Sequence, residues 1–314
     1  MNIKIPSSEE SLLRIKDYIN KTPLFYSERL SKTSKSNVYL KLENLQITGS
    51  FKARGALNKV LKTKIDKNPV AASSGNHGAA VSYALSVKNK RGIIYVPNSA
   101  ISSKVKKIKS YGSDVIKFGE DCLDAENEAI KFSKENNIEF ISPYNDVDII
   151  SGQGTIAVEI MNQINDLDAV FVTVGGGGLI SGIAYYLKSL NPNIEVVGCS
   201  PENSSIMINS IKSGKITNKK SLETLSDGSA GGVEEGSITF DLCKNYIDHF
   251  CLVKEGEISE QIRNAIYYEK FIIEGAAAVA IASFIKMKDL FINKNIAIIV
   301  CGGNIDSKTI KSVI

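Results

Sequence analysis

Residues 170–179 read Val-Phe-Val-Thr-Val-Gly-Gly-Gly-Gly-Leu, an apolar strand pattern that runs directly into four glycines and then a helical pattern. Four consecutive glycines, Gly175, Gly176, Gly177 and Gly178, lose much conformational entropy on folding, so some function must require bare backbone there. Successive N–H groups without Cβ atoms, followed by the positive end of a helix, are suited to holding a phosphate. A tight turn needs only one or two glycines. The stretch therefore predicts a phosphate cradle at a strand end.

Short apolar runs and helical patterns alternate along the rest of the chain. We predict strands at 38–42, 70–72, 93–96, 170–174, 194–199 and 296–301. We predict helices at 50–63, 76–88, 102–111, 120–136, 151–165, 179–190, 257–269 and 274–288. A first helix begins at the capping box Ser7-x-x-Glu10 and ends near Lys21-Thr22-Pro23. This alternation predicts an α/β fold with mostly parallel sheets covered by helices.

The chain has no internal repeat, no low-complexity tract and no linker rich in Pro, Gly or Ser. Two domains, if present, must therefore interleave. The least regular segment is 212–236, which contains Asp227-Gly228 and Gly231-Gly232. We predict a long surface loop there, with a role in function as the alternative.

Composition excludes several classes of protein. Of the 314 residues, 38 are Lys or Arg and 34 are Asp or Glu, and no dense basic run is present, so we expect no nucleic-acid partner. Five scattered cysteines and two distant histidines lack the spacing of a metal site, so we expect none. The N-terminus has no apolar signal segment, and no apolar run approaches about 20 residues. We therefore expect a cytoplasmic protein without a membrane partner.

A second feature surrounds Lys52, in the stretch Thr48-Gly-Ser-Phe-Lys-Ala-Arg-Gly-Ala56. We expect Ser50 to cap a helix whose first turn contains Lys52. A cation at that end opposes the helix dipole, which lowers the pKa of the amine and suits it to nucleophilic chemistry. Taken alone, the residue is better explained as a solvated surface lysine, because lysine is abundant in this chain.

Two further loops follow predicted strands. One is Ser73-Ser-Gly-Asn-His-Gly78, whose hydroxyls, amide and free N–H groups would receive a carboxylate or a ring oxygen. A structural turn that caps the next helix is the alternative. The other loop is Cys301-Gly-Gly-Asn304. Ligands of open parallel sheets bind at the carboxyl ends of strands, which favours a shared site for these loops.

Five motifs together resemble the serine/threonine dehydratase and serine racemase family of fold-type II pyridoxal-phosphate enzymes. They are Ser50–Ala56, Ser73–Gly78, Ser151-Gly-Gln-Gly-Thr155, Gly175–Gly178 and Cys301–Asn304, in the family's order over almost the whole chain. The resemblance implies two open, mostly parallel twisted sheets flanked by helices, with the cofactor between two domains. It places a small domain at 68–144 inside a large one of 1–67 and 145–314, and implies a homodimer.

The resemblance also implies roles for individual residues. Lys52, preceded by Phe51, forms the Schiff base with pyridoxal 5'-phosphate, and the glycines Gly175 to Gly178 with Leu179 hold its phosphate. Asn76 bonds the phenolic oxygen, and Cys301 faces the pyridine nitrogen. Glu274 lies beside the ring, although the family often has Pro where this chain has Gly275. The substrate carboxylate is received by the loop Ser73, Ser74, Gly75, Asn76 and His77.

The implied reaction is a β-elimination on an amino-acid substrate. Lys52 removes the Cα proton, the β-hydroxyl of L-threonine or L-serine departs, and hydrolysis yields 2-oxobutanoate or pyruvate plus ammonia. Racemisation is an alternative, because Ser74 stands where racemases place a second proton donor. Cys301 favours a dehydratase, and Ser200 and Ile206 replace the acidic metal ligands of racemases. A β-replacement enzyme of the cysteine-synthase type and a non-catalytic protein that binds a phosphate ligand remain further alternatives.

Overall fold

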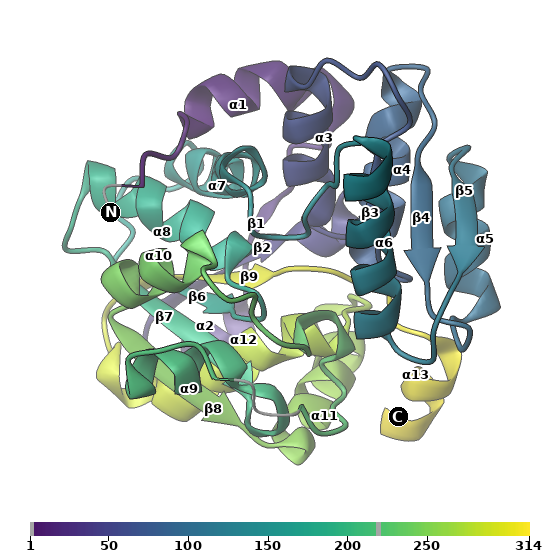
Figure 1. Cartoon of the computed structure of the whole chain (residues 1–314). Helices are drawn as coiled ribbons and strands as arrows, with labels where there is room; N and C mark the ends of the chain where they lie inside the picture. The colour runs from purple at the N-terminus through teal and green to yellow at the C-terminus, as the bar shows by residue number, and fades with distance from the viewer. Residues whose placement is uncertain (1–2, 218–220) are drawn as a thin grey trace.

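Two separate β-sheets organise the computed structural model, which describes residues 3–217 and 221–314 (Figure 1). The larger sheet has six strands in the order β1-β2-β9-β6-β7-β8, and only β1 runs antiparallel to its neighbour. Its strands are β1 (Leu24–Tyr26), β2 (Asn37–Leu42), β6 (Ala169–Thr173), β7 (Glu195–Pro201), β8 (His249–Val253) and β9 (Asn295–Val300). Parallel strands place their carboxyl ends at one edge, where the predicted site loops begin.

The smaller sheet contains three parallel strands, β3 (Val70–Ala72), β4 (Ile93–Val96) and β5 (Asp114–Lys117). It lies at the right of Figure 1 with α4 (Asn76–Val87), α5 (Ser102–Ser110) and α6 (Cys122–Asn136). All six elements fall within residues 68–144. However, α3 (Lys52–Lys62) adds Ala56, Leu57 and Val60 to the apolar cluster of this sheet. The division of the chain into two domains therefore stays a prediction.

The remaining helices mostly cover the larger sheet. Helices α7 and α8 pack together on one side, and α12 packs against β6, β7, β8 and β9 on the other (Figure 1). The bounds are α1 (Ser8–Ile15), α2 (Glu28–Ser34), α7 (Val147–Met161), α8 (Gly178–Leu190), α9 (Ile206–Ser213), α10 (Ile238–Tyr246), α11 (Glu255–Asn264), α12 (Gly275–Met287) and α13 (Ser307–Val313). None of the helices among the described residues has the length and apolar character that a bilayer crossing requires.

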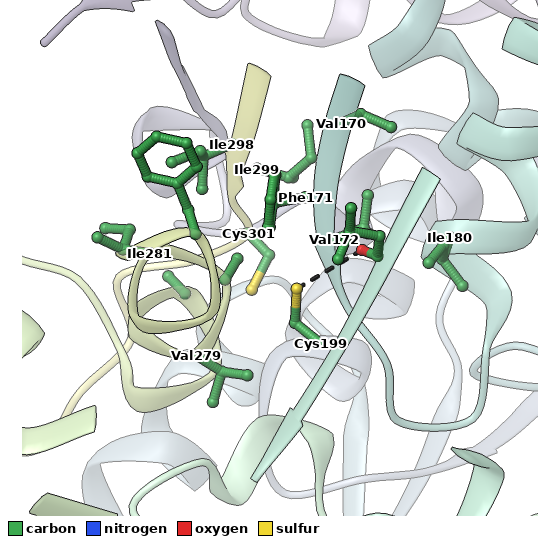
Figure 2. Close-up of a cluster of buried hydrophobic side chains, with 14 of the residues drawn as sticks. Val170, Phe171, Val172, Ile180, Cys199, Val279, Ile281, Ile298, Ile299 and Cys301 are labelled. Carbon is green, nitrogen blue, oxygen red and sulfur yellow. Dashed lines mark hydrogen bonds between the residues drawn. The ribbon is translucent and has the colours of Figure 1, made fainter. Parts of the chain in front are cut away.

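The central strands form because their sequences are apolar on both faces. All five residues of β6 are buried, as are five of the six in β9. Figure 2 shows side chains of β6 and β9 beside Ile180 of α8 and Val279 and Ile281 of α12. A strand covered by helices on both sides needs such a continuous apolar run. This core fixes the strand ends from which the glycine run and Cys301 emerge.

The predicted α/β fold is confirmed, and all six predicted strands are present. Three strands were not predicted. Strands β1 and β5 lie at sheet edges and are largely exposed, and β8 lacks a continuous buried pattern, so none of them has the apolar run that marks a buried strand. Four short helices were also not predicted: α2, α9, α10 and α13. Helix α7 begins at Val147 rather than 151, because Asp146 caps it by accepting from two main-chain N–H groups.

The irregular segment 212–236 differs from the predicted surface loop, although residues 218–220 lie outside the described part. Ser226 and Val233 are buried. The carbonyl oxygen of Ser229 lies only 2.8 Å from where a Cβ of Gly175 would stand. The segment therefore packs against the glycine run, because that run offers bare backbone to it.

Candidate active site

Main-chain hydrogen bonds join three segments at the strand ends. The N–H of Phe51 donates to the carbonyl of Cys301 at 3.0 Å, and Ser50 forms an isolated antiparallel bridge with Gly302. The N–H of Glu274 donates to the carbonyl of Gly302, also at 3.0 Å. These contacts bring together Lys52, Cys301 and Glu274, which are far apart in the sequence.

Lys52 is the first residue of α3. The predicted Ser50 cap is wrong: Phe51 occupies the cap position without a side-chain bond, and the buried Ser50 hydroxyl has no partner among the described residues. The Lys52 amine donates to the carbonyl of Pro143 at 2.8 Å. Burial lowers the pKa of Lys52 to about 8, although Cys301 and Glu274 act in the opposite direction. The main cause is thus loss of water rather than the helix dipole.

Each glycine of the run Gly175–Gly178 stands where a side chain would collide with a neighbour. A Cβ on Gly176 would meet the ring of Tyr144, and one on Gly178 would lie 2.9 Å from the Cα of Tyr144. Gly177 has φ +87° and lies against Cys243, Met207 and Thr239. The run is glycine at all four positions because the surrounding chain already fills the space.

The amides of the glycine run have no acceptors in the part of the chain that the structure describes. Gly177 caps α8 without a side-chain bond, and the first amide with a main-chain acceptor is that of Ser181. The run is instead held through a carbonyl group: the Thr239 hydroxyl donates to the Gly176 carbonyl at 2.6 Å. Unpaired N–H groups at a helix N-terminus bind anions. The run is therefore equipped to hold a phosphate.

Asn76, the first residue of α4, lies between Glu274 and Asn304. Its amide donates to both carboxylate oxygens of Glu274, at 2.9 and 3.0 Å, and accepts from the Asn304 amide at 2.6 Å. Glu274 occupies the N-terminal cap position of α12 without a side-chain capping bond, and burial raises its pKa. A Cβ on Gly302 would stand 2.7 Å from the Glu274 carboxylate, so glycine there admits the acid.

The loop Ser73–His77 contains a local turn, but that turn does not cap the next helix, and the role in binding a carboxylate stays a prediction. Ser73 makes a local turn by accepting from the N–H of Gly75 at 3.1 Å, yet α4 begins at Asn76 with no side-chain cap. His77 is buried, and its Nε2 lies 2.9 Å from the Ile141 carbonyl. Burial lowers the pKa of His77 to about 3, with the Lys52 charge adding to the effect. The imidazole is therefore neutral, and with its Nε2 atom at the Ile141 carbonyl it brings no positive charge to a carboxylate.

Comparison with known proteins identifies the family. Residues 15–302 match the family described as pyridoxal-phosphate dependent enzyme. The chain belongs to this family. It is 38% identical to the L-threonine ammonia-lyase of Thermotoga maritima, over 99% of this chain and 78% of that protein.

Two solved structures are also similar to this pyridoxal-phosphate dependent enzyme. The structure of maize serine racemase superposes with a TM-score of 0.93 at 29% identity, covering 99% of this chain and 97% of that one. A processed threonine deaminase isoform from Solanum lycopersicum gives 0.91 at 31% identity, covering 99% and 95%. The predicted fold type and cofactor are thereby confirmed.

Cys301 follows β9 and is buried in the same apolar core as Cys199 (Figure 2). Burial raises the pKa of Cys301 well above its ordinary value, and the nearby Glu274 acts in the same direction. The group is therefore a neutral thiol at physiological pH. A neutral thiol differs from a carboxylate because it has no negative charge with which to hold a proton on a neighbouring base.

The residues at the racemase metal positions make other contacts. Ser200 donates its hydroxyl to the Val174 carbonyl at 2.9 Å, and Ile206 is buried. Within residues 3–217 and 221–314, no group of three or more His, Cys, Asp or Glu side chains is arranged to hold a metal ion.

Sequence reasoning missed the segment Pro143–Asn145. Pro143 accepts from Lys52, Tyr144 packs on the glycine run, and the Asn145 amide donates to Glu234 at 2.8 Å. The Tyr144 hydroxyl accepts from the N–H of Glu234 at 2.9 Å. The segment thus links Lys52, the glycine run and the irregular loop. The sequence of this segment indicates only a loop before a capped helix, because the residues that it contacts lie far away along the chain.

Proposed function

We propose that this protein uses pyridoxal phosphate, bound through Lys52, to eliminate water from L-threonine or L-serine. The products are 2-oxobutanoate or pyruvate, and ammonia. Similarity to the L-threonine ammonia-lyase and the threonine deaminase supports this substrate class. The observation that carries the proposal is the Lys52 amine, whose pKa burial lowers to about 8, connected through Pro143 and Tyr144 to the unpaired amides of the glycine run.

The residues present fit the cofactor. The glycine run with Leu179 would hold the phosphate, and Asn76 and Glu274 would lie beside the ring with Phe51 and Cys301. When bound, pyridoxal phosphate supplies electron delocalisation that makes the Cα–H bond of an amino acid acidic. The uncapped start of α4, with Ser73 and Ser74 beside it, would bind the substrate carboxylate.

Lys52 is suited to move the Cα proton. A general base works best when its pKa lies near the operating pH, and burial brings that of Lys52 to about 8. Cys301 contributes a neutral thiol, which would leave the pyridine nitrogen without a protonating partner. We infer that this favours prompt loss of the β-hydroxyl over reprotonation at Cα. If Cys301→Asp left the ratio of elimination to racemisation unchanged, this inference would be wrong.

Serine racemisation is the second candidate. The observation that favours it is Ser74, a half-buried hydroxyl on the loop before α4 with no hydrogen bond to the described residues, together with the similarity to maize serine racemase. A racemase needs a second proton donor opposite Lys52, and Ser74 would supply it. Two residues favour dehydration instead: Cys301, and Ser200, which stands where racemases have an acidic metal ligand and bonds to the Val174 carbonyl.

The decisive experiment incubates the protein with L-threonine, L-serine and D-serine. Release of 2-oxo acid and the enantiomer ratio of the remaining amino acid are measured together. Borohydride reduction should fix the cofactor on the peptide that contains Lys52. Lys62→Ala, on the same helix but partly exposed, is the matched control for Lys52→Ala. Release of no 2-oxo acid from any substrate, or cofactor fixed elsewhere, would contradict the proposal.

The domain division, the oligomeric state and the cellular location belong to the same proposal. We propose a large domain of residues 1–67 and 145–314 with a small domain of 68–144, a homodimer, and a cytoplasmic location. Analytical ultracentrifugation would test the oligomeric state. Limited proteolysis near residues 67 and 145 would test the domain boundaries.

A further inference from the structure

Lys107 of α5 begins a chain of polar side chains that ends at the site. Its amine donates to the Oδ1 atom of Asn304 at 2.7 Å and to the carbonyl of Thr48 at 2.9 Å. The side chain is half-buried, and burial lowers the pKa of Lys107. It belongs to the smaller sheet's helices, whereas both acceptors belong to segments at the edge of the larger sheet.

Asn304 connects Lys107 to Asn76, and the contact with Lys107 fixes which atom of the Asn304 amide donates. Its Oδ1 atom accepts from Lys107, so its Nδ2 atom is the donor, to the Thr48 carbonyl at 2.9 Å and to Asn76 Oδ1 at 2.6 Å. Gly49, at φ +74°, leaves room for this amide, since a Cβ there would lie 2.7 Å from Asn304 Oδ1. An ammonium group can only donate, so it permits a single orientation of the Asn304 amide.

The orientation of Asn76 follows from that of Asn304. Because Asn76 Oδ1 accepts from Asn304, its NH₂ group is directed to the other side, toward Glu274. Glu274 supports the same orientation from the opposite side, because both of its carboxyl oxygens accept from the Asn76 NH₂ group. Lys107 is the donor-only end of the chain.

We propose that Lys107 is a positioning residue for the cofactor: through Asn304 it holds the Asn76 amide with its NH₂ group facing the cofactor ring. This inference rests on the proposed function, in which Asn76 donates to the phenolic oxygen of pyridoxal phosphate. The reversed amide would place Oδ1 against that oxygen, which is repulsive when the oxygen is ionised. Lys107 would therefore affect both the affinity for the cofactor and its absorption spectrum.

The test compares purified Lys107→Met, Lys107→Arg and Lys106→Met proteins after removal and re-addition of pyridoxal phosphate. We expect Lys107→Met to bind the cofactor about tenfold more weakly, with a shifted visible absorption band, because a hydrogen bond to a charged group is lost. Lys107→Arg should restore the spectrum and come within about threefold of the original affinity. Lys106, exposed on the same helix, is the matched control and should change neither.

A second variant keeps the test decisive if Lys107→Met fails to fold. Asn304→Asp retains an acceptor for Lys107 but removes the donor to Asn76, so it should produce the same spectral shift. Combining the two changes should add no further shift. An unchanged spectrum in Asn304→Asp or Lys107→Met, or a change that Lys107→Arg does not restore, would overturn the proposal. Failure of the unaltered protein to bind the cofactor would instead refute the proposed function.

Discussion

Two cations two residues apart on α3, Lys52 and Arg54, occupy opposite electrostatic environments. The Lys52 amine faces the site with one hydrogen bond, to Pro143. The guanidinium of Arg54 is fully buried and donates twice to Glu43 and twice to Glu159, at 2.7 to 2.9 Å. Lys41 adds a second cation to this cluster and donates to Glu159 at 2.6 Å. The same helical turn therefore carries one unpaired and one fully paired cation.

Counter-charges decide in which direction burial shifts the pKa of a cation. Burial lowers the pKa of Lys52 to about 8 because no carboxylate bonds to it. Burial also opposes the charge of Arg54, but Glu43 and Glu159 outweigh it and raise the pKa of the guanidinium. The paired cation anchors the start of the helix, and the unpaired one is free to react. Four predictions test this division of roles.

The largest effect is expected from Lys52→Ala. Turnover of L-threonine or L-serine should fall by about 10²–10⁴-fold, the usual contribution of a positioned general base. Stability should change little, because removal of an unpaired buried charge costs no ion pair. Urea unfolding and 2-oxo acid release would be measured on the same preparation. If Lys52→Ala were unfolded under the assay conditions, so that unfolding accounted for the lost activity, Lys52 would be a structural residue.

Arg54→Met should produce the opposite pattern. Removing one partner of a buried ion pair leaves Glu43 and Glu159 uncompensated, so the free energy of unfolding should fall by about 3–5 kcal/mol. Arg54→Lys retains the charge without the bidentate fork and should fall in between. Chemical denaturation measures both. If Arg54→Met is as stable as the original protein, the anchoring role is refuted.

The glycine run allows a similar comparison between two uncapped helix starts. A methyl group on Gly176 would strike the Tyr144 ring, so Gly176→Ala should destabilise the protein by about 1–3 kcal/mol and weaken cofactor binding. Gly75 has only Ser73 Oγ near its Cβ position, at 3.9 Å, so Gly75→Ala is the control. Thermal unfolding and cofactor titration would measure the two effects. Equal losses in both variants would show that packing by Tyr144 does not explain the run.

The smallest effect concerns pH. Only the neutral amine attacks an aldehyde, so the rate at which cofactor-free protein takes up pyridoxal phosphate should rise with pH and level off above about 8. Below that value the rate should fall about tenfold per pH unit, as the amine becomes protonated. Stopped-flow absorbance gives the profile. A midpoint near the ordinary lysine value would mean that Lys52 is hydrated.

Much of the site could be predicted because each motif is local. The glycine run follows an apolar strand, and Lys52 and Asn76 begin helices, so the ends of strands and helices could be located by periodicity. The His77 ring could not be placed, because its partner, the Ile141 carbonyl, lies 64 residues away. Tyr144 and Lys107 gave no signal, since an aromatic residue in a loop and a lysine on an amphipathic helix are both ordinary.

The sequence by itself determined the alternation of strands and helices and the glycine run, because periodicity and backbone freedom are properties of neighbouring residues. That Lys52 is the reactive lysine is implied by the family resemblance and stays a prediction. Only the tertiary structure decided which charges are paired. Arg54 meets Glu159, 105 residues away, and the Lys52 amine meets only the carbonyl of Pro143. Electrostatic energies depend on distance in space and on exclusion of water, and neither can be calculated from the order of residues.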